Sequence, residues 1–169
     1  MRLGLSSEAA PDASLGDLIR FATRRGLATL ELREGDAHGI APGSSATDAA
    51  AAAESVRAAG LTIAGYRTDR LEDADWLARL SGSLAAAVLL AGPVPLTARV
   101  ARGERIKAAR GEVAIVLRGE SAVWDGLVCH AAGLPLAWEA DPRLGPVGTM
   151  AASLLDRFGG ALGHIRLIG

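Results

Sequence analysis

Residues 134–142 read LPLAWEADP, a short apolar run that ends in two acids, Glu139 and Asp141. In a β-strand, residues i and i+2 share a face, so both carboxylates would project the same way from the strand's carboxyl end. Parallel α/β folds keep their chemistry at this end of their strands. The stretch therefore predicts a parallel strand with a candidate site where it ends.

Other β-rich runs recur along the chain, and each interval between them carries a helical pattern. They lie at residues 2–6, 28–33, 61–66, 86–91, 113–117 and 164–168. Strand starts recur about every 21 to 33 residues, which is typical of βα units in a parallel sheet with right-handed crossovers. The run at 86–91 is wholly apolar, as a strand covered on both faces should be. The pattern predicts an α/β fold with about seven parallel strands.

Three segments carry helix signals. Ser14 and Asp17 have the spacing of a capping box and predict the start of the first helix. The segment 96–110 is expected to be a weaker helix, interrupted at Gly103. Ser121 is expected to open a helix that packs through one apolar face. That face would carry Val123, Trp124, Leu127 and Val128.

Composition excludes several classes of function. A net charge of −1 and a pI near 6.3 give no basic surface for a nucleic-acid backbone. Cys129 is the only cysteine, which excludes an intrachain disulfide. No long uncharged apolar stretch and no glycine-rich nucleotide motif occurs. We expect a cytoplasmic protein with no membrane or nucleic-acid partner.

Three segments resemble the xylose isomerase-like TIM barrels, the sugar phosphate isomerase/epimerase superfamily. RLGLS at 2–6 and SLGDLIRFATRRGLATLELR at 14–33 are similar to that family's first βαβ unit, and LGHIRLIG at 162–169 is similar to a later strand. The resemblance covers nearly the whole chain. It implies a single barrel domain over residues 1–169 and a small sugar-like ligand.

The chain is short for such a barrel. A complete (β/α)₈ barrel has typically about 250 residues and at least about 200, whereas this sequence has 169. We therefore expect an incomplete (β/α) TIM-type barrel that lacks the eighth strand. Either the chain is a fragment of a longer protein, or its open edge is covered by another chain, such as a second copy in a homo-oligomer. An open flavodoxin-like parallel sheet is the alternative fold.

Two alignments with the family lead to different sites. The family holds a divalent metal with a Glu, an Asp and a His at strand ends. When the hydrophobic runs of this chain are aligned with those of the family, Arg118, Glu139 and Arg166 fall at the positions of these three ligands. Arginine has no lone pair to give to a metal, so this alignment, which we favour, implies an arginine–glutamate charge cluster and no metal. The second alignment shifts each strand by two residues, which keeps the side chains on the same face of the sheet. It allows the binding of Mn²⁺, Mg²⁺ or Zn²⁺. The ligands would then be Glu120, Asp141 and His164.

The resemblance also supplies candidate roles. The candidate catalytic residues are Glu31, Arg118, Glu139 and Arg166. The candidate substrate-binding residues are Arg33, Arg67, Trp138 and His164. Trp138 would present its indole N–H to the pocket. The other two histidines, His38 and His130, are expected on the surface or on helices.

Two functions remain open at this point. One is an isomerase or epimerase that acts on a sugar or sugar phosphate. The other is a non-catalytic relative, or pseudoenzyme, that retains the fold for ligand binding or assembly. Whether the chain is an enzyme is thus undecided by the sequence, and its metal content would separate the two functions.

Overall fold

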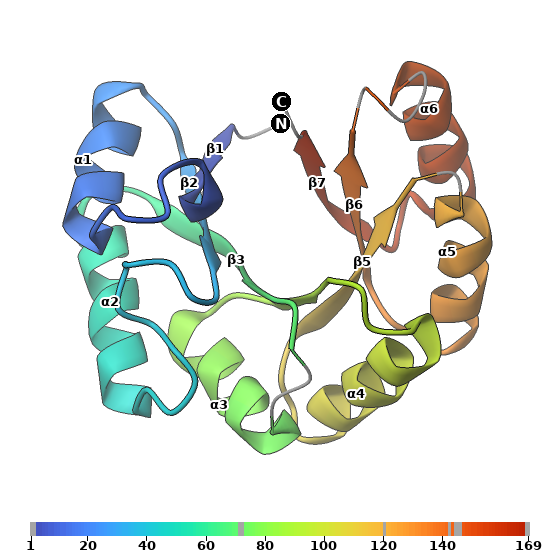
Figure 1. Ribbon diagram of the computed structural model, residues 1–169, viewed down its shortest axis with the longest axis horizontal. Coiled ribbons are helices and arrows are strands. Elements are labelled where there is room, and N and C mark those ends of the chain that lie inside the picture. The colour runs from blue at the N-terminus through green and yellow to red at the C-terminus, as the bar shows by residue number, and fades with distance from the viewer. Residues whose placement is uncertain (1–2, 71–72, 120, 142, 144–146, 168–169) are drawn as a thin grey trace.

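The computed structural model describes residues 3–70, 73–119, 121–141, 143 and 147–167. Within them, seven parallel strands form one sheet with helices on its outer side (Figure 1). The strands are β1 (Gly4–Ser6), β2 (Thr29–Arg33), β3 (Thr62–Thr68), β4 (Val88–Leu90), β5 (Val113–Arg118), β6 (Leu136–Ala140) and β7 (Leu162–Leu167). The helices are the 3₁₀ helix η1 (Ser7–Ala9), α1 (Leu15–Arg24), α2 (Ala46–Ala58), α3 (Ala74–Leu84), α4 (Leu96–Ala108), α5 (Ala122–Ala131) and α6 (Val147–Phe158).

The strands lie side by side in chain order, from β1 to β7, and the sheet curls so that its two edges approach each other (Figure 1). Crossovers of one hand then place every helix outside, as in a TIM barrel. In the part of the chain that the structure describes, β1 and β7 are edge strands that do not pair with each other. The fold is therefore an incomplete (β/α) TIM-type barrel, as predicted. A flavodoxin-like sheet would place β1 between β2 and β3 and is excluded.

The predicted start of α1 is confirmed. Ser14 accepts a hydrogen bond from the backbone of Asp17, and the Asp17 side chain accepts one in return. The same capping box, made by Ser45 and Asp48, begins α2. These caps satisfy backbone N–H groups that have no partner within the helix.

The hydrophobic core has two layers. Apolar side chains on the outer faces of the strands pack against the helices in two large clusters. A much smaller cluster lies inside the barrel and comprises Leu89, Ala91, Ala114, Val116 and Ala137. The inner layer is built mainly from small residues, so the barrel interior leaves room above and below it. None of the helices in the described segments is long and apolar enough to cross a membrane.

Two expectations about helices are wrong. The helix α4 runs without interruption through Gly103, which is buried because it packs against the next strand. A Cβ atom at Gly103 would lie 3.1 Å from a methyl carbon of Leu134. Close packing, rather than a helix break, therefore accounts for this glycine.

The buried face of α5 is also not the predicted one. It consists of Ala122, Gly126 and Cys129, whereas Trp124 is 71% exposed. Gly126 faces the ring of Phe158, which a Cβ atom would approach to 2.7 Å. Small residues let α5 approach the ring closely and turn the larger apolar residues outward, toward solvent. The exposed side chains are Trp124, Leu127 and Val128.

Candidate functional site

The register of the last three strands aligns three charged residues. Arg118 of β5 pairs with Glu139 of β6, and Glu139 pairs with Arg166 of β7. Parallel strands in register point paired side chains to the same face. All three therefore project into the barrel near the carboxyl ends of their strands, which is the arrangement of the first alignment.

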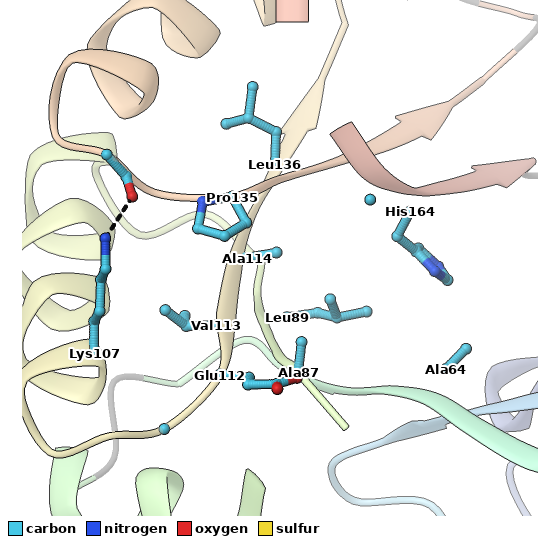
Figure 2. Close-up of a pocket in the computed structure, with 13 residues that line it drawn as sticks. Ala64, Ala87, Leu89, Lys107, Glu112, Val113, Ala114, Pro135, Leu136 and His164 are labelled. Carbon is cyan, nitrogen blue, oxygen red and sulfur yellow. Dashed lines mark hydrogen bonds between the residues drawn. The ribbon is translucent and has the colours of Figure 1, made fainter. Parts of the chain in front are cut away.

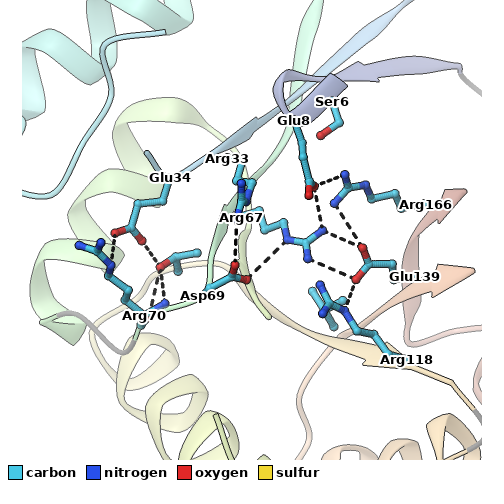
Figure 3. Close-up of polar contacts among 12 residues, drawn as sticks. Ser6, Glu8, Arg33, Glu34, Arg67, Asp69, Arg70, Arg118, Glu139 and Arg166 are labelled. Atoms are coloured by element: carbon cyan, nitrogen blue, oxygen red, sulfur yellow. Dashed lines mark hydrogen bonds and ion pairs between the residues drawn. The ribbon is translucent and has the colours of Figure 1, made fainter. Parts of the chain in front are cut away.

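Glu139 is the centre of these contacts (Figure 3). Its two oxygens accept hydrogen bonds from both terminal nitrogens of Arg67 on β3, at 2.9 and 3.3 Å. Nη1 of Arg166 donates to Oε1 at 3.4 Å, and Nε of Arg118 donates to Oε2. Three guanidinium groups from three strands therefore share a carboxylate that is only 4% exposed.

Glu8, on η1 directly after β1, brings a second carboxylate to the same place. It pairs with Nη2 of Arg166 and lies 3.6 Å from Nη1 of Arg67. The strand pattern did not identify Glu8 because it lies beyond the strand, on a turn where the two-residue alternation no longer predicts facing. Its position just after the first strand was the available signal.

Glu31 on β2 is the third carboxylate. It accepts hydrogen bonds from Ser6 at 3.0 Å and from His164 of β7 at 2.9 Å, and it lies 3.5 Å from Arg166. Burial opposes ionisation of Glu31, but the hydrogen bond from His164 and the charge of Arg166 outweigh it and lower the pKa of Glu31. Glu31 is therefore an anion that links β2 to β7.

We call this set the arginine–glutamate cluster. It comprises Glu8, Glu31, Arg67, Arg118, Glu139 and Arg166, with three charges of each sign. Although guanidinium groups donate to Glu139, its burial, with the carboxylates of Glu8 and Glu31, raises its pKa to about 7. Glu139 is thus the carboxyl group of the cluster that changes charge near neutral pH.

Other residues singled out in the sequence lie apart from the cluster or at its rim. Arg33 binds Asp69 at 3.3 Å and reaches Asp36 at 3.9 Å. Trp138 is buried in the outer layer between strands and helices, on the opposite face from Glu139, and its indole N–H has no partner in the described chain. The structure therefore does not bring Trp138 to the inner face.

The residues at the strand ends do not fit a divalent cation. Asp141 is bound by Arg143 through two side-chain hydrogen bonds of 2.8 Å, and His164 is bound to Glu31. Glu120 lies outside the described residues. Among the residues that are described, no three His, Cys, Asp or Glu side chains are grouped so as to hold a metal ion. Guanidinium groups occupy the positions where the first alignment would place ligands, and they cannot coordinate a cation.

His38 is not a surface residue, contrary to expectation. It is 5% exposed, and its ring lies 2.7 Å from the carbonyl oxygen of Arg33 and accepts from the backbone N–H of Ile40 at 3.2 Å. Since Nδ1 is the acceptor, Nε2 carries the proton and donates. Burial lowers the pKa of His38. The neutral ring thus holds the loop after β2 in place.

No protein-family model matches the sequence, and a comparison with curated proteins finds no match. Solved structures do match. A xylose isomerase domain containing protein from Salmonella typhimurium LT2 has a TM-score of 0.63 and 18% identity, over 97% of this chain and 70% of that chain. A xylose isomerase domain protein from Planctomyces limnophilus has a TM-score of 0.64 and 12% identity, over 97% of this chain and 72% of its own.

Barrels with other names match at a similar level. The 3-hexulose-6-phosphate synthase from Salmonella typhimurium has a TM-score of 0.59 and 13% identity, over 100% of this chain and 79% of that chain. At these identities the likeness concerns the fold alone. Together with the order of its strands, it shows that this chain has the (β/α) barrel fold of the xylose isomerase domain proteins.

Proposed function

We propose that this protein binds a small sugar-like ligand with an anionic group, such as a sugar phosphate, and does so without a metal ion. The arginine–glutamate cluster would take the place that a metal has in the related isomerases. The ligand would lie at the carboxyl ends of the strands, where (β/α) barrels keep their sites.

The observation that carries the proposal is the arrangement of the Arg118 guanidinium group. Its Nε donates to Glu139, whereas Nη1 and Nη2 have no partner among the described residues. The Arg118 side chain is 45% exposed, and the Glu139 side chain that holds it is 3% exposed. A guanidinium group anchored at one nitrogen and open at the other two presents a fixed pair of donors, which suits a phosphate or carboxylate.

The other two arginines of the cluster would contribute charge rather than contacts. Arg67 is 4% exposed in its side chain and uses both terminal nitrogens on Glu139. Arg166 is 15% exposed and divides its terminal nitrogens between Glu139 and Glu8. The terminal nitrogens of both arginines thus bind carboxylates of the protein. Only Arg118 can turn toward a ligand without breaking a buried pair.

The proposal is tested by titration calorimetry with ribose and ribose 5-phosphate in the presence of EDTA. We expect ribose 5-phosphate to bind and ribose to bind at least tenfold more weakly, because charge-assisted hydrogen bonds contribute about 1.5–3 kcal/mol. Arg118→Lys should lose most of this preference, since lysine has no paired donors. Arg20→Lys, on the exposed side of α1, is the matched control. Equal binding by the Arg118→Lys and Arg20→Lys variants would refute the role of Arg118.

A metal-independent isomerase is a second candidate, and the pair formed by Glu31 and His164 favours it. A buried carboxylate that orients a histidine is a common means of moving protons between substrate atoms. If the protein isomerises pentose or hexose phosphates in EDTA, His164→Gln should abolish turnover and leave binding of the phosphate by Arg118 largely intact. Absence of turnover with intact binding would favour the non-catalytic function.

A further inference from the structure

A cavity of about 380 Å³ lies on the amino-terminal side of the strands, and Figure 2 shows the residues that line it. Its walls come from the amino-terminal parts of β3 to β7 and from the connections that lead into them. Ala64, Ala87, Ala114 and Leu136 are among the apolar lining residues. Lys107 also lines it and donates to the carbonyl oxygen of Gly133 at 2.8 Å. The cavity is therefore mainly apolar, with charge confined to one side.

Small residues on the inner face create this space. Complete barrels fill their interiors with layers of bulky branched side chains, whereas Ala64, Ala87 and Ala114 project little volume. A Cβ atom at Gly163 of β7 would meet no atom within 4 Å. The cavity is partly open to solvent, so a ligand with an apolar surface would displace water from these walls.

His164 offers a side-chain acceptor to this cavity, in addition to the exposed residues Lys107 and Glu112 in the lining. Its Nε2 lies 2.9 Å from Oε2 of Glu31, which is an anion and therefore accepts the N–H. In the neutral imidazole the other nitrogen, Nδ1, is then an acceptor. Nδ1 has no partner among the described residues, and the ring lines the cavity (Figure 2). Glu31 thus fixes both the tautomer and the orientation of this acceptor.

We propose that the cavity binds a small, neutral, mainly apolar molecule that donates one N–H or O–H hydrogen bond to Nδ1 of His164. A volume of about 380 Å³ suits a molecule of one or two rings, because an apolar cavity of about 150 Å³ already holds benzene. A neutral ligand is favoured because the charged side chains in the lining, Lys107 and Glu112, belong to exposed residues that stay in contact with water. Arg118 does not line the cavity, whereas His164 lines it and also binds Glu31 of the arginine–glutamate cluster.

The test compares indole with indene, which has the same shape and lacks the N–H. Binding is followed by NMR titration of the whole chain at one fixed pH. We expect saturable binding of both probes and about three- to tenfold tighter binding of indole, the range for one hydrogen bond. His164→Phe should remove the preference and still bind both probes. Equal affinities for indole and indene in the unmodified protein would overturn the role of Nδ1.

Filling the cavity tests the location. Ala64→Leu adds three carbons at the wall of the cavity, where Ala64 is half-buried. We expect this substitution to weaken the binding of both probes at least tenfold. Ala98→Leu on α4, outside the cavity, is the matched control and should bind like the unmodified protein. Unchanged binding by Ala64→Leu, or no saturable binding of either probe to the unmodified protein, would contradict the proposal. Binding of ribose 5-phosphate to the unmodified protein and to Arg118→Lys is measured separately, which distinguishes failure of this proposal from failure of the proposed function.

Discussion

Arg67 and Glu139 meet across the inside of the barrel through two parallel hydrogen bonds of 2.9 and 3.3 Å, although they are 72 residues apart in the sequence. Both side chains are almost fully buried. Glu139→Ala would leave the Arg67 guanidinium without its main partner, and we expect a loss of about 3 kcal/mol in the free energy of unfolding. Urea denaturation measures this loss.

Glu139→Gln should be milder, because an amide oxygen still accepts a hydrogen bond from Arg67. Asp141→Ala is the control just after the same strand, where the Asp141 side chain is 13% exposed and its partner Arg143 is 72% exposed. It should change the urea midpoint little. Equal midpoints for Glu139→Ala and Asp141→Ala would show that the buried pair does not hold the barrel together.

Binding of sulfate should strengthen as the pH falls from 8 to 6. The pKa of Glu139 is raised to about 7, so the folded protein takes up a proton on this carboxyl over that range. Protonation removes one negative charge next to Arg118 and frees its Nε. We expect about three- to tenfold tighter binding at pH 6, from the Coulomb energy of one charge at this distance. Sulfate keeps its charge throughout, so the change belongs to the protein.

The Glu139→Gln variant has no carboxyl group at position 139. It should bind sulfate with the same affinity at both pH values. A persistent pH dependence in this variant would assign the effect to another group. Weaker binding at pH 6 than at pH 8 in the unmodified protein would contradict the role of Glu139 directly.

His38 should make the fold sensitive to mild acid. Its pKa is lowered in the folded state, because burial disfavours the charged ring. The unfolded chain therefore binds the proton first as the pH falls below about 6.5, the ordinary value for histidine. The contribution of His38 to stability is complete above that pH and decreases below it. Thermal unfolding at several pH values between 5 and 8 measures the decrease.

The comparison uses two glutamine variants. His38→Gln should be less stable at pH 8 and should lose less stability on acidification than the unmodified protein. His130→Gln, at an exposed position of α5, should follow the unmodified protein at each pH. If His38→Gln and the unmodified protein lose the same stability as the pH falls, the buried ring of His38 does not cause the acid sensitivity.

Gly103 should not tolerate a larger side chain, because α4 packs there against Leu134 and Ile115 at contact distance. We expect Gly103→Val to lower the free energy of unfolding by about 2 kcal/mol through overpacking. Gly82→Ala in α3 meets no atom within 4 Å and should raise it by about 0.5–1 kcal/mol through helix propensity. Urea denaturation of both variants distinguishes close packing from a general effect of glycine replacement.

The strands and their inner charges could be predicted because a parallel strand leaves a clear pattern. Matching the hydrophobic runs to the xylose isomerase-like family put Arg118, Glu139 and Arg166 at the strand ends, and period-two alternation indicated which strand-end residues share a face. The register of the folded sheet pairs these same residues. Their roles in binding or catalysis remain predictions.

Other features depend on contacts that a one-dimensional pattern does not contain. The helix α5 is apolar on nearly every face, so hydrophobicity alone could not show that Gly126, and not Trp124, faces the core. His38 lies in a polar loop that has the composition of a surface segment. It is buried because backbone groups of Arg33 and Ile40 need a partner there.

The central claim is that an anionic ligand binds to arginine at the carboxyl ends of the strands, without a metal ion. The most direct test is the dissociation constant of ribose 5-phosphate, measured by calorimetry once in EDTA and once with Mn²⁺ added. We predict the same dissociation constant in both conditions, with no stoichiometric Mn²⁺ bound to the protein. Binding that appears only with Mn²⁺, together with one Mn²⁺ retained per chain, would contradict the account.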